Sequence, residues 1–404
     1  MASVRDILPA DRATRLLAGS SLVNTFGNGV FYTVSVVYFT QVVGLSAHEL
    51  AVGLFAAGLA GIAVGIPAGH LADRWGARQL LVALTLLAAG AMAAFALVSG
   101  FVGFVVVSCV YAVFDRGAGA VRQALIAEVV PSEGRVRTRA YLRSVTNVGM
   151  GAGSLVAAVA LVVDVPAGYV AVIVLDGLTF LGAAALIARL PRSVPCERAA
   201  GDPVLPVLRD KPYVAFCVLF AVASVQFTLL EVAVPLWVVT QTSAPTWSIA
   251  AVVFLNTAVV AVFQVPASRG TEEVGPAAVA LRTSGWVVLA ACGIFAATTG
   301  PGPVGAVLLL LLGALVHVVG EMRQSAGGWG VAYGLAPDAL QGQYQGLFST
   351  SMATSHAIGP LLVAALPIAF GTAGWIAFGL IVVAASVASV PVSRWGLATR
   401  TVTA

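Results

Sequence analysis

The sequence predicts an all-α integral membrane protein whose twelve transmembrane helices form two six-helix bundles. Of its 404 residues, 59% are hydrophobic and 9% are charged, whereas soluble globular domains carry about 25% charged residues. A helix needs about 20 predominantly apolar residues to cross the hydrocarbon core of a membrane. Twelve runs of this kind follow one another along the chain, at residues 16–42, 49–70, 79–99, 101–124, 139–163, 168–190, 212–240, 247–267, 277–299, 303–326, 345–369 and 371–393.

A single long polar segment divides these runs into six and six. Residues 191–212 contain five prolines and seven charged residues, a composition that breaks helices and favours contact with water. The sequence therefore predicts an N-terminal six-helix bundle at residues 1–190, a cytoplasmic linker at 191–211 and a C-terminal six-helix bundle at 212–404.

The basic residues predict the orientation of the chain. Those of the 21 Arg and Lys residues that lie in loops precede run one or follow runs two, four, six, eight and twelve, and none lies in a loop on the other side. Because basic loops stay on the cytoplasmic side, both termini are expected to be cytoplasmic in a multi-pass protein of the cell membrane, here a bacterial inner membrane. The +4 net charge then reflects topology and does not indicate binding to nucleic acid.

The sequence contains no pattern of a soluble enzyme, a nucleotide-driven pump or a metal site. Its four cysteines, Cys109, Cys196, Cys217 and Cys292, lie on separate segments, so neither a disulfide framework nor a metal site is expected. A phosphate-binding G-x-x-x-x-G-K-[ST] loop and a G-x-S-x-G nucleophile turn do not occur. We therefore expect no catalytic residue and no cofactor, and a gradient remains as the source of energy.

The turn between runs two and three is short, charged and rich in glycine. It reads G-H-L-A-D-R-W-G-A-R and contains Gly69, Asp73, Arg74, Gly76 and Arg78. Glycine permits a tight turn with positive φ and a close approach of helices. An aspartate at a membrane surface can pair with an arginine or cap the N-terminus of a helix.

This turn closely resembles the signature loop of the major facilitator superfamily, which reads G-x-L-A-D-R-x-G-R-K between the second and third helices. It departs from that loop at Ala77, which displaces the family's arginine by one place, and at Gln79, which replaces its lysine. The resemblance implies the major facilitator fold and a conformational latch formed by the five residues named above. A plain interfacial turn with solvated charges is the alternative.

The two predicted bundles are similar at matching positions. A displacement of 199 residues aligns Asp73 with Glu272, and a displacement of 206 residues aligns Asp115 with Glu321. Parallel repeats of this kind occur in facilitator-type transporters, whose site lies between the repeats near the middle of the bilayer. The pattern favours two similar bundles around a central site.

Run five contains a glycine-rich stretch. Gly149 and Gly153 are spaced as in G-x-x-x-G, which lets two helix backbones touch. The stretch G-M-G-A-G-S-L resembles the fifth-helix motif of the drug/proton antiporters of the superfamily, although Ser154 stands where that motif has proline. Gly359 and Pro360 carry the Gly-Pro pair at the equivalent place in the second half. Helix packing alone is the alternative role.

Ionisable side chains inside the membrane are the strongest functional signal after the signature turn. A charge at the centre of the bilayer costs about 2.5–3.5 kcal/mol, so it needs a partner, a water-filled cavity or a function. These charges fall on runs four, seven and ten, three of the four helices that the resemblance implies line a central cavity. The predicted proton- and substrate-coupling residues are Asp115, Arg116, Glu231, Glu321, Arg323 and His317.

Each of these residues has a structural alternative. Asp115 and Arg116 are adjacent and point about 100° apart on a helix, so each could pair with another helix. Arg323 could neutralise Glu321 instead of binding a ligand. Asp176, in run six, is predicted to be structural.

Neutral polar side chains complete the predicted cavity. Asn24, Asn28 and Tyr32 recur every four residues on one face of run one. Gln226 lies close to Glu231 in run seven, and His356 lies in run eleven. Histidines inside a helical bundle can also serve only as helix contacts.

Tryptophans near the predicted helix ends suit the interfacial belts of a membrane protein. Trp237 and Trp247 lie near the outer surface, and Trp75 and Trp395 lie near the inner surface. We expect all four to be anchors and not ligands.

The resemblance and the intramembrane carboxyl groups together predict a secondary transporter. The predicted function is proton-coupled efflux of a small amphiphilic compound, a drug or a metabolite, by alternating access. The expected partners are this small-molecule substrate, protons and the lipid bilayer, with no nucleic acid, and the protein is expected to act as a monomer. Uptake or facilitated diffusion of a small metabolite is one alternative. A non-transporting membrane sensor is another, against which the intact signature turn argues.

Overall fold

The computed structural model describes residues 11–163, 165–195 and 204–401, and most of these residues are helical. Within these ranges there is no β-strand, so the all-α prediction is confirmed. Residues 196–203 of the predicted linker, which include Cys196, lie outside the described residues. The other three cysteines are free thiols.

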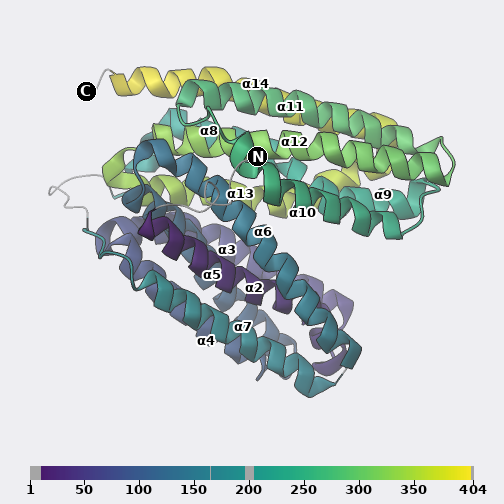
Figure 1. The fold of residues 1–404 in the computed structure, drawn as a ribbon, viewed down its shortest axis with the longest axis horizontal. Coiled ribbons are helices and arrows are strands. Elements are labelled where there is room, and N and C mark those ends of the chain that lie inside the picture. Colours follow the sequence, from purple (N-terminus) through teal and green to yellow (C-terminus); the bar gives the residue numbers. More distant parts are fainter. Residues whose placement is uncertain (1–10, 164, 196–203, 402–404) are drawn as a thin grey trace. The chain divides into compact units, whose positions relative to one another are not determined.

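Six long helices make up the first half of the chain (Figure 1). They are α2 (Arg12–Val37), α3 (Ala47–Trp75), α4 (Ala77–Phe95), α5 (Phe101–Val129), α6 (Ser132–Val163) and α7 (Pro166–Ile187), with a π-helical turn η1 (Tyr38–Val42) after α2. Asp11 caps α2 by accepting a 2.9 Å hydrogen bond from the backbone of Thr14, which lowers the pKa of the Asp11 carboxyl. Ser46 and Glu49 form a capping box at the start of α3.

The second half begins with a short 3₁₀ turn and a span that is broken into several pieces. The elements are η2 (Pro206–Arg209), α8 (Lys211–Ser224), the 3₁₀ turn η3 (Val225–Phe227), the π turn η4 (Leu229–Ala233), α9 (Val234–Gln241), α10 (Trp247–Ala267), α11 (Val274–Ala296), η5 (Ala297–Thr299), α12 (Pro303–Leu335), η6 (Asp338–Leu340), α13 (Gln341–Val363), the π turn η7 (Ala364–Ile368) and α14 (Ala369–Thr401). Helix α11 packs against both α12 and α14 (Figure 1).

Among the residues that the structure describes, ten helical segments are long and apolar enough to cross a membrane, by length and composition. The last of them, residues 338–400, contains both α13 and α14, and α2 is not among the ten. The twelve predicted runs correspond to α2–α7, to α8 with α9, and to α10–α14. Helix α6 begins at Ser132, before the predicted start of its run at 139, because its Arg-rich first turns are helical without being apolar.

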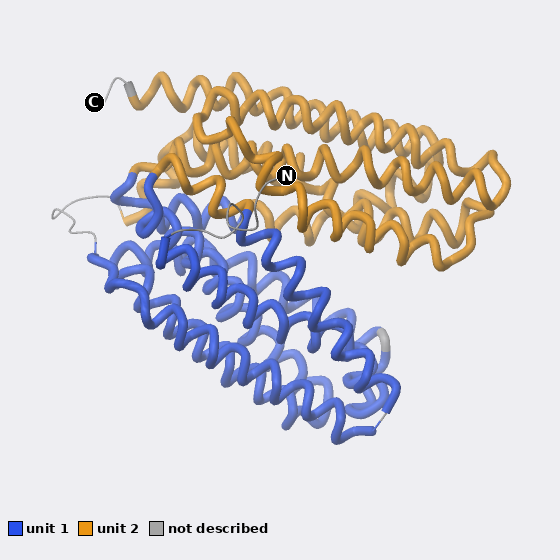
Figure 2. The backbone as a smooth tube through the Cα atoms, viewed as in Figure 1, with its two compact units in different colours: residues 1–131, 141–203, 338–350 blue, residues 132–140, 204–337, 351–404 orange. Residues whose placement is uncertain are grey.

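The chain forms two compact units, coloured separately in Figure 2. Unit 1 contains residues 1–131, 141–203 and 338–350, and unit 2 contains residues 132–140, 204–337 and 351–404. The first turns of α6 therefore group with unit 2, and the first turns of α13 group with unit 1. These two segments correspond under the displacement of 206 residues. The bundle boundaries at 190 and 212 remain predictions.

Aromatic rings form the core of unit 1. Phe31, Phe39, Phe95, Phe104 and Tyr111 are all buried. The ring centroids of Phe39 and Phe104 are 4.6 Å apart, and those of Phe31 and Phe95 are 5.5 Å apart. Such pairs contribute about 0.5–1.5 kcal/mol each beyond the area they bury. Because lipid is as apolar as these side chains, close packing is what holds the helices together.

Glycines bring α6 and α2 into contact in unit 1. A Cβ atom at Gly149 would overlap the hydroxyl of Thr25, and one at Gly153 would overlap the carbonyl of Phe26. The close helix contact predicted from the G-x-x-x-G spacing is therefore confirmed. About two turns further along α2, the hydroxyl of Thr33 donates a 3.0 Å hydrogen bond to Ser154, the residue that replaces the family's proline.

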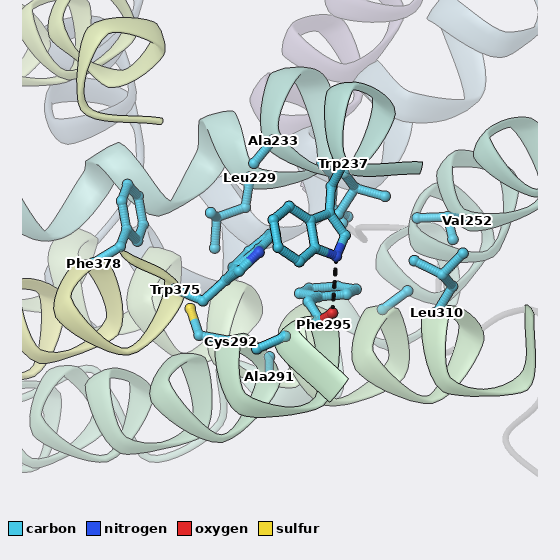
Figure 3. Close-up of a cluster of buried hydrophobic side chains, with 14 of the residues drawn as sticks. Leu229, Ala233, Trp237, Val252, Ala291, Cys292, Phe295, Leu310, Trp375 and Phe378 are labelled. Atoms are coloured by element: carbon cyan, nitrogen blue, oxygen red, sulfur yellow. Dashed lines mark hydrogen bonds between the residues drawn. The ribbon is translucent and has the colours of Figure 1, made fainter. Parts of the chain in front are cut away.

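Two tryptophans form the centre of the core of unit 2 (Figure 3). Trp237 is 1% exposed, and its ring lies 5.6 Å from that of Trp375 at 82°. Its indole N–H lies 3.0 Å from the hydroxyl of Thr298 and 3.2 Å from the carbonyl of Phe295. The prediction that Trp237 is an interfacial anchor is wrong, since nearness to a helix end does not fix which face a residue occupies. Trp247, by contrast, is 60% exposed, as an anchor would be.

Candidate functional site

The aspartate of the signature turn caps a helix that is distant in sequence. Helix α3 ends at Trp75 and is followed by Gly76, whose φ is 91°, and Asp73 lies in the last turn of the helix. Asp73 Oδ1 accepts a 2.6 Å hydrogen bond from the backbone N–H of Gly342, and Oδ2 accepts one of 3.0 Å from Gln343. Both donors belong to the first turn of α13, where the free N–H groups and the helix dipole favour an anion.

Four glycines let α3 and α13 approach closely at this point in unit 1. A Cβ atom at Gly69 would overlap the carbonyl of Gly342, and one at Gly346 would overlap the carbonyl of Gly65. Each helix thus presents two glycines four residues apart. Gly342 and Gly346 are not among the residues predicted from the sequence, although their G-x-x-x-G spacing is a signal that could have identified them.

The remaining residues of the turn bind the segment that follows α7. The backbone N–H of Arg78 donates a 2.9 Å hydrogen bond to Ser193 Oγ, and its guanidinium donates to the carbonyl of Ala188. The side chain of Gln79 exchanges two hydrogen bonds, of 2.9 and 3.2 Å, with the backbone of Ser193. The glutamine that replaces the family's lysine therefore anchors the turn. Arg74 is exposed and has no hydrogen bond or ion pair within the described ranges.

The predicted polar face of α2 lies beside α5 in unit 1. Asn24 is 4% exposed, and its Oδ1 lies 3.4 Å from the guanidinium of Arg122 on α5. The Oδ1 of Asn28 is buried and finds no hydrogen-bond partner among the residues that the structure describes. Tyr32 is 46% exposed. The structure thus brings the predicted residues of runs one and four together, with Arg122 as an additional member.

Asp115 is the centre of the charges in unit 1. It is partly buried on α5, next to the exposed Arg116. It interacts electrostatically with Arg116 and with Arg122, and also with Tyr32 on α2 and with Asp176 on α7. Asp176, which the sequence predicts to be structural, therefore belongs to this group of interacting charges.

Glu231 lies where the first span of unit 2 loses its α-helical form. It belongs to the π turn η4, in which the N–H of Val234 bonds to the carbonyl of Leu229. Pro235 follows, and proline cannot donate the backbone hydrogen bond that the carbonyl of Glu231 would accept in an α-helix. π turns of this kind are frequent at functional sites. Glu231 itself is an exposed residue.

A second polar group of unit 2 joins three helices beside this break. Nε2 of His317, on α12, lies 3.2 Å from the backbone carbonyl of Gln226. Nδ1 of the same ring lies 3.9 Å from Oε2 of Glu321, one turn further along α12. Asn256, on α10, donates a 2.8 Å hydrogen bond to that oxygen. The predicted proximity of His317 and Glu321 is confirmed, and Asn256 is a member that no sequence pattern indicated.

The same region of unit 2 contains the other residues predicted for runs seven and eleven. Both polar atoms of the Gln226 side chain are buried without a hydrogen-bond partner in the part of the chain that the structure describes. The ring of His356, on α13, stacks on Phe227 with centroids 6.4 Å apart and 25° between the planes. Glu231 interacts electrostatically with Glu321. Together these residues form what we term the unit 2 polar cluster: Gln226, Phe227, Glu231, Asn256, His317, Glu321 and His356.

Arg323 contacts α11, whereas its predicted alternative role was to neutralise Glu321. Its Nε donates a 2.8 Å hydrogen bond to the hydroxyl of Thr283 on α11. The partners of Glu321 described above are His317 and Asn256. Within the described ranges, no group of three or more His, Cys, Asp or Glu residues could hold a metal ion.

Comparisons with known proteins identify the family. The model of the Major Facilitator Superfamily matches residues 17–360, and no curated protein matches the chain in sequence. A bacterial homologue of the iron transporter ferroportin in an outward-facing state has a TM-score of 0.75 at 16% identity, covering 96% of this chain and 100% of that one.

Two other solved structures are similar over nearly their whole length. The human organic anion transporter MFSD10 has a TM-score of 0.68 at 14% identity, covering 94% of this chain and 99% of that one. The proton:xylose symporter XylE, bound to 6-bromo-6-deoxy-D-glucose, has a TM-score of 0.67 at 14% identity, covering 93% and 94%. At these identities the likeness concerns the fold alone. The chain belongs to the Major Facilitator Superfamily and is a multi-pass membrane protein with the fold of that family's transporters.

Proposed function

We propose that this transporter exports a small amphiphilic compound in exchange for protons, in the manner of the drug/proton antiporter branch of its superfamily. The observation that carries the proposal is the unit 2 polar cluster, in which Glu231, His317 and Glu321 adjoin a break in a membrane-spanning helix. Two carboxyl groups and an imidazole in an apolar bundle are costly unless something neutralises them. A proton does so, and histidine and carboxyl groups exchange protons readily.

The two glutamates of the cluster have different surroundings and therefore different roles. Glu231 is exposed and exchanges protons with water, whereas Glu321 is 5% exposed and is held by Asn256. Because the two carboxyl groups interact electrostatically, a proton that binds to one favours the charged form of the other. A protonated His317 would pair with Glu321 across the 3.9 Å that separates them.

Exchange follows from this arrangement by alternating access. A proton from outside binds a carboxyl group of the cluster and weakens the binding of substrate there. The return of the protein to its inward-facing state releases the proton. A gradient of one pH unit supplies about 1.4 kcal/mol per proton, enough for about tenfold accumulation.

The rings of the cluster support an amphiphilic substrate. Phe227 and His356 stack beside Gln226, whose buried amide has no partner within the described ranges. An apolar body can lie on such rings, while an amide and a carboxylate recognise a polar end. Asp115 and Arg116 of unit 1 are the second candidates for coupling, with Asn24, Asn28 and Tyr32 beside them.

The signature turn supports the conformational part of the proposal. Asp73 caps α13 only while the first turn of that helix lies against it. Gly69 and Gly76 permit the close approach and the turn, and Arg78 ties the turn to the segment after α7. We infer that this contact forms in one state of the transport cycle and opens in the other. We also propose that the protein acts as a monomer in the cell membrane. Both termini lie in the cytoplasm in this proposal, as the distribution of the basic residues favours.

Proton flux in proteoliposomes tests the proposal. Vesicles loaded with a pH-sensitive dye are challenged with lipophilic cations, neutral antibiotics and sugars, one at a time. We expect a substrate of the first two classes to evoke proton movement in the opposite direction, and we expect Glu231→Gln to abolish it. Glu133→Gln, which removes an exposed carboxyl group at the start of α6, is the matched control.

The outcomes separate the possible functions. Substrate flux without proton movement would contradict proton coupling and would favour facilitated diffusion. Proton movement in the same direction as the substrate would replace exchange by symport. A normal pH profile in Glu231→Gln would transfer the coupling role to Glu321 or Asp115.

A further inference from the structure

The carboxyl group of Asp176, in the middle of α7, is buried more completely than any residue of unit 1 that is proposed above for proton coupling. Asp176 has 0% of its surface exposed. The hydroxyl of Thr179 lies 3.1 Å from its Oδ1 and 2.7 Å from its backbone carbonyl. Its Oδ2 is buried and has no hydrogen-bond partner in the described part of the chain. One of the two carboxyl oxygens therefore lacks a donor.

The space for this carboxyl group is provided by a glycine. A Cβ atom at Gly27, on α2, would overlap both Oδ1 of Asp176 and the hydroxyl of Thr179. Asp176 thus lies in the contact between α2 and α7, and these two helices enclose it. Water has no direct access to a side chain in such a contact, so its charge cannot be stabilised by hydration.

The charged groups around Asp176 do not compensate for this burial. Helices α2 and α4 and the turn η1 pack against α7. The ionisable side chains on these elements and on α5 are Arg12, Arg15 and Tyr32 of α2, Tyr38 of η1, Arg78 of α4, and Cys109, Tyr111, Asp115, Arg116, Arg122 and Glu128 of α5. The charged group that interacts with Asp176 is Asp115, which has the same sign.

We propose that Asp176 is a proton-binding site of unit 1, enclosed between α2 and α7, with Asp115 on α5 as a neighbouring group of the same charge. A buried carboxylate with a like charge nearby and an oxygen without a donor is unfavourable, and binding of one proton removes both costs. Asp115 is only partly buried, whereas Asp176 is fully buried and keeps its proton out of contact with water. No bond other than O–H forms or breaks.

This inference rests on the proposed function for one point, namely that the proton contributes to transport. Protonation of Asp176 itself can be measured without any transport. Infrared difference spectroscopy of the full-length protein in lipid detects the carbonyl stretch of a protonated carboxylic acid. Asp176→Asn is nearly isosteric, removes only the titratable group and is the variant of choice. Thr179→Val retains the carboxyl group and removes its hydrogen bond.

We expect the wild-type protein to have a protonated-acid band that Asp176→Asn lacks. Thr179→Val should retain this band at a shifted frequency, because the hydrogen bond to Oδ1 is lost. In proteoliposomes, Asp176→Asn should reduce the accumulation sustained by one pH unit from about tenfold to about onefold. The fluorescence-detected melting temperature of each variant checks that it is folded.

The outcomes keep the two proposals apart. A wild-type spectrum without a band that depends on Asp176 would overturn the proton site, whatever the flux measurements give. A band that disappears in Asp176→Asn supports the site even when the wild-type protein moves no protons with substrate, in which case only the proposed function fails. A band that disappears while accumulation remains tenfold would overturn the role of this proton in transport.

Discussion

The side-chain amide of Asn256 donates a 2.8 Å hydrogen bond to Oε2 of Glu321 and so joins α10 to α12. A hydrogen bond from a neutral donor to a carboxylate stabilises its charged form. This contact therefore fixes the position of the Glu321 carboxyl group between the two helices. It also holds the carboxyl group 3.9 Å from His317.

Replacement of Asn256 should slow proton-driven transport. In Asn256→Ala the carboxyl group of Glu321 loses a hydrogen-bond donor on α10 that helps to hold it beside His317. We expect the initial rate to fall by about tenfold, as loss of a hydrogen bond to a charged group implies. The measurement is the initial transport rate in proteoliposomes under a gradient of one pH unit. Gln264→Ala, which removes an amide on the same helix that donates to a backbone carbonyl, should leave the rate unchanged; equal losses in both variants would contradict the role of Asn256.

Removal of the charge from the signature turn should slow the transport cycle. Asp73→Asn keeps the shape of the side chain but loses the anion at the N-terminus of α13, an interaction with a helix end that contributes about 1–2 kcal/mol. We expect turnover to fall by about 5- to 30-fold without loss of membrane insertion. Glu272 is the residue of the second half that aligns with Asp73, and its side chain has no hydrogen bond or ion pair within the described ranges. Glu272→Gln therefore serves as the control. Unaltered turnover of Asp73→Asn would remove the latch role.

The glycine crossing of α3 and α13 should be sensitive to a single methyl group. Gly69→Ala would introduce a Cβ atom that overlaps the carbonyl of Gly342, whereas a Cβ atom at Gly58 on the same helix meets no atom within 4 Å. Overpacking of this kind costs about 1–3 kcal/mol. We expect the melting temperature in detergent to fall in Gly69→Ala and to stay the same or rise in Gly58→Ala, since alanine favours the helix. Equal stabilities would mean that α3 and α13 do not touch at Gly69.

The buried tryptophan of unit 2 should contribute to stability and not to coupling. Trp237→Phe removes an indole N–H that lies 3.0 Å from Thr298 and leaves that hydroxyl with one partner fewer. We expect a loss of about 1–3 kcal/mol, measured as a lower melting temperature. The exposed Trp247 provides the matched variant, Trp247→Phe, for which little change is expected. A changed pH profile in Trp237→Phe would show that the side chain also acts in transport.

The fold was predictable because the membrane imposes strong constraints on sequence. Span length and the distribution of basic residues depend on the thickness and polarity of the bilayer, which do not vary with tertiary contacts. The helix break at Glu231 was not predicted, although Pro235 lies four residues later and cannot donate to its carbonyl. The extent of the break, with a 3₁₀ turn followed by a π turn, depends on packing and was not predicted.

The candidate site was predicted in part, and the reason differs between residues. His317 and Glu321 are one helical turn apart, so their proximity follows from sequence spacing alone. The contacts of Asn256 with Glu321 and of Arg323 with Thr283 join helices that are distant in sequence. Such pairs depend on how helices are rotated about their axes, and nearly uniform hydrophobicity around these helices gives no indication of that rotation. Trp237 was misinterpreted for the same reason.

The assignment of the first turns of α13 to unit 1 has a consequence for biosynthesis. The N-terminal bundle leaves the ribosome well before residues 338–350 are translated, so Asp73 has no helix end to cap while most of the second half is being made. Folding of domains in the order of synthesis is the usual route for long chains, yet unit 1 here cannot reach its final form in that order. The first bundle can be completed only after the eleventh span, α13, has been made. In a chain released before that point, Asp73 would lie in the turn after the second span without its contact to α13.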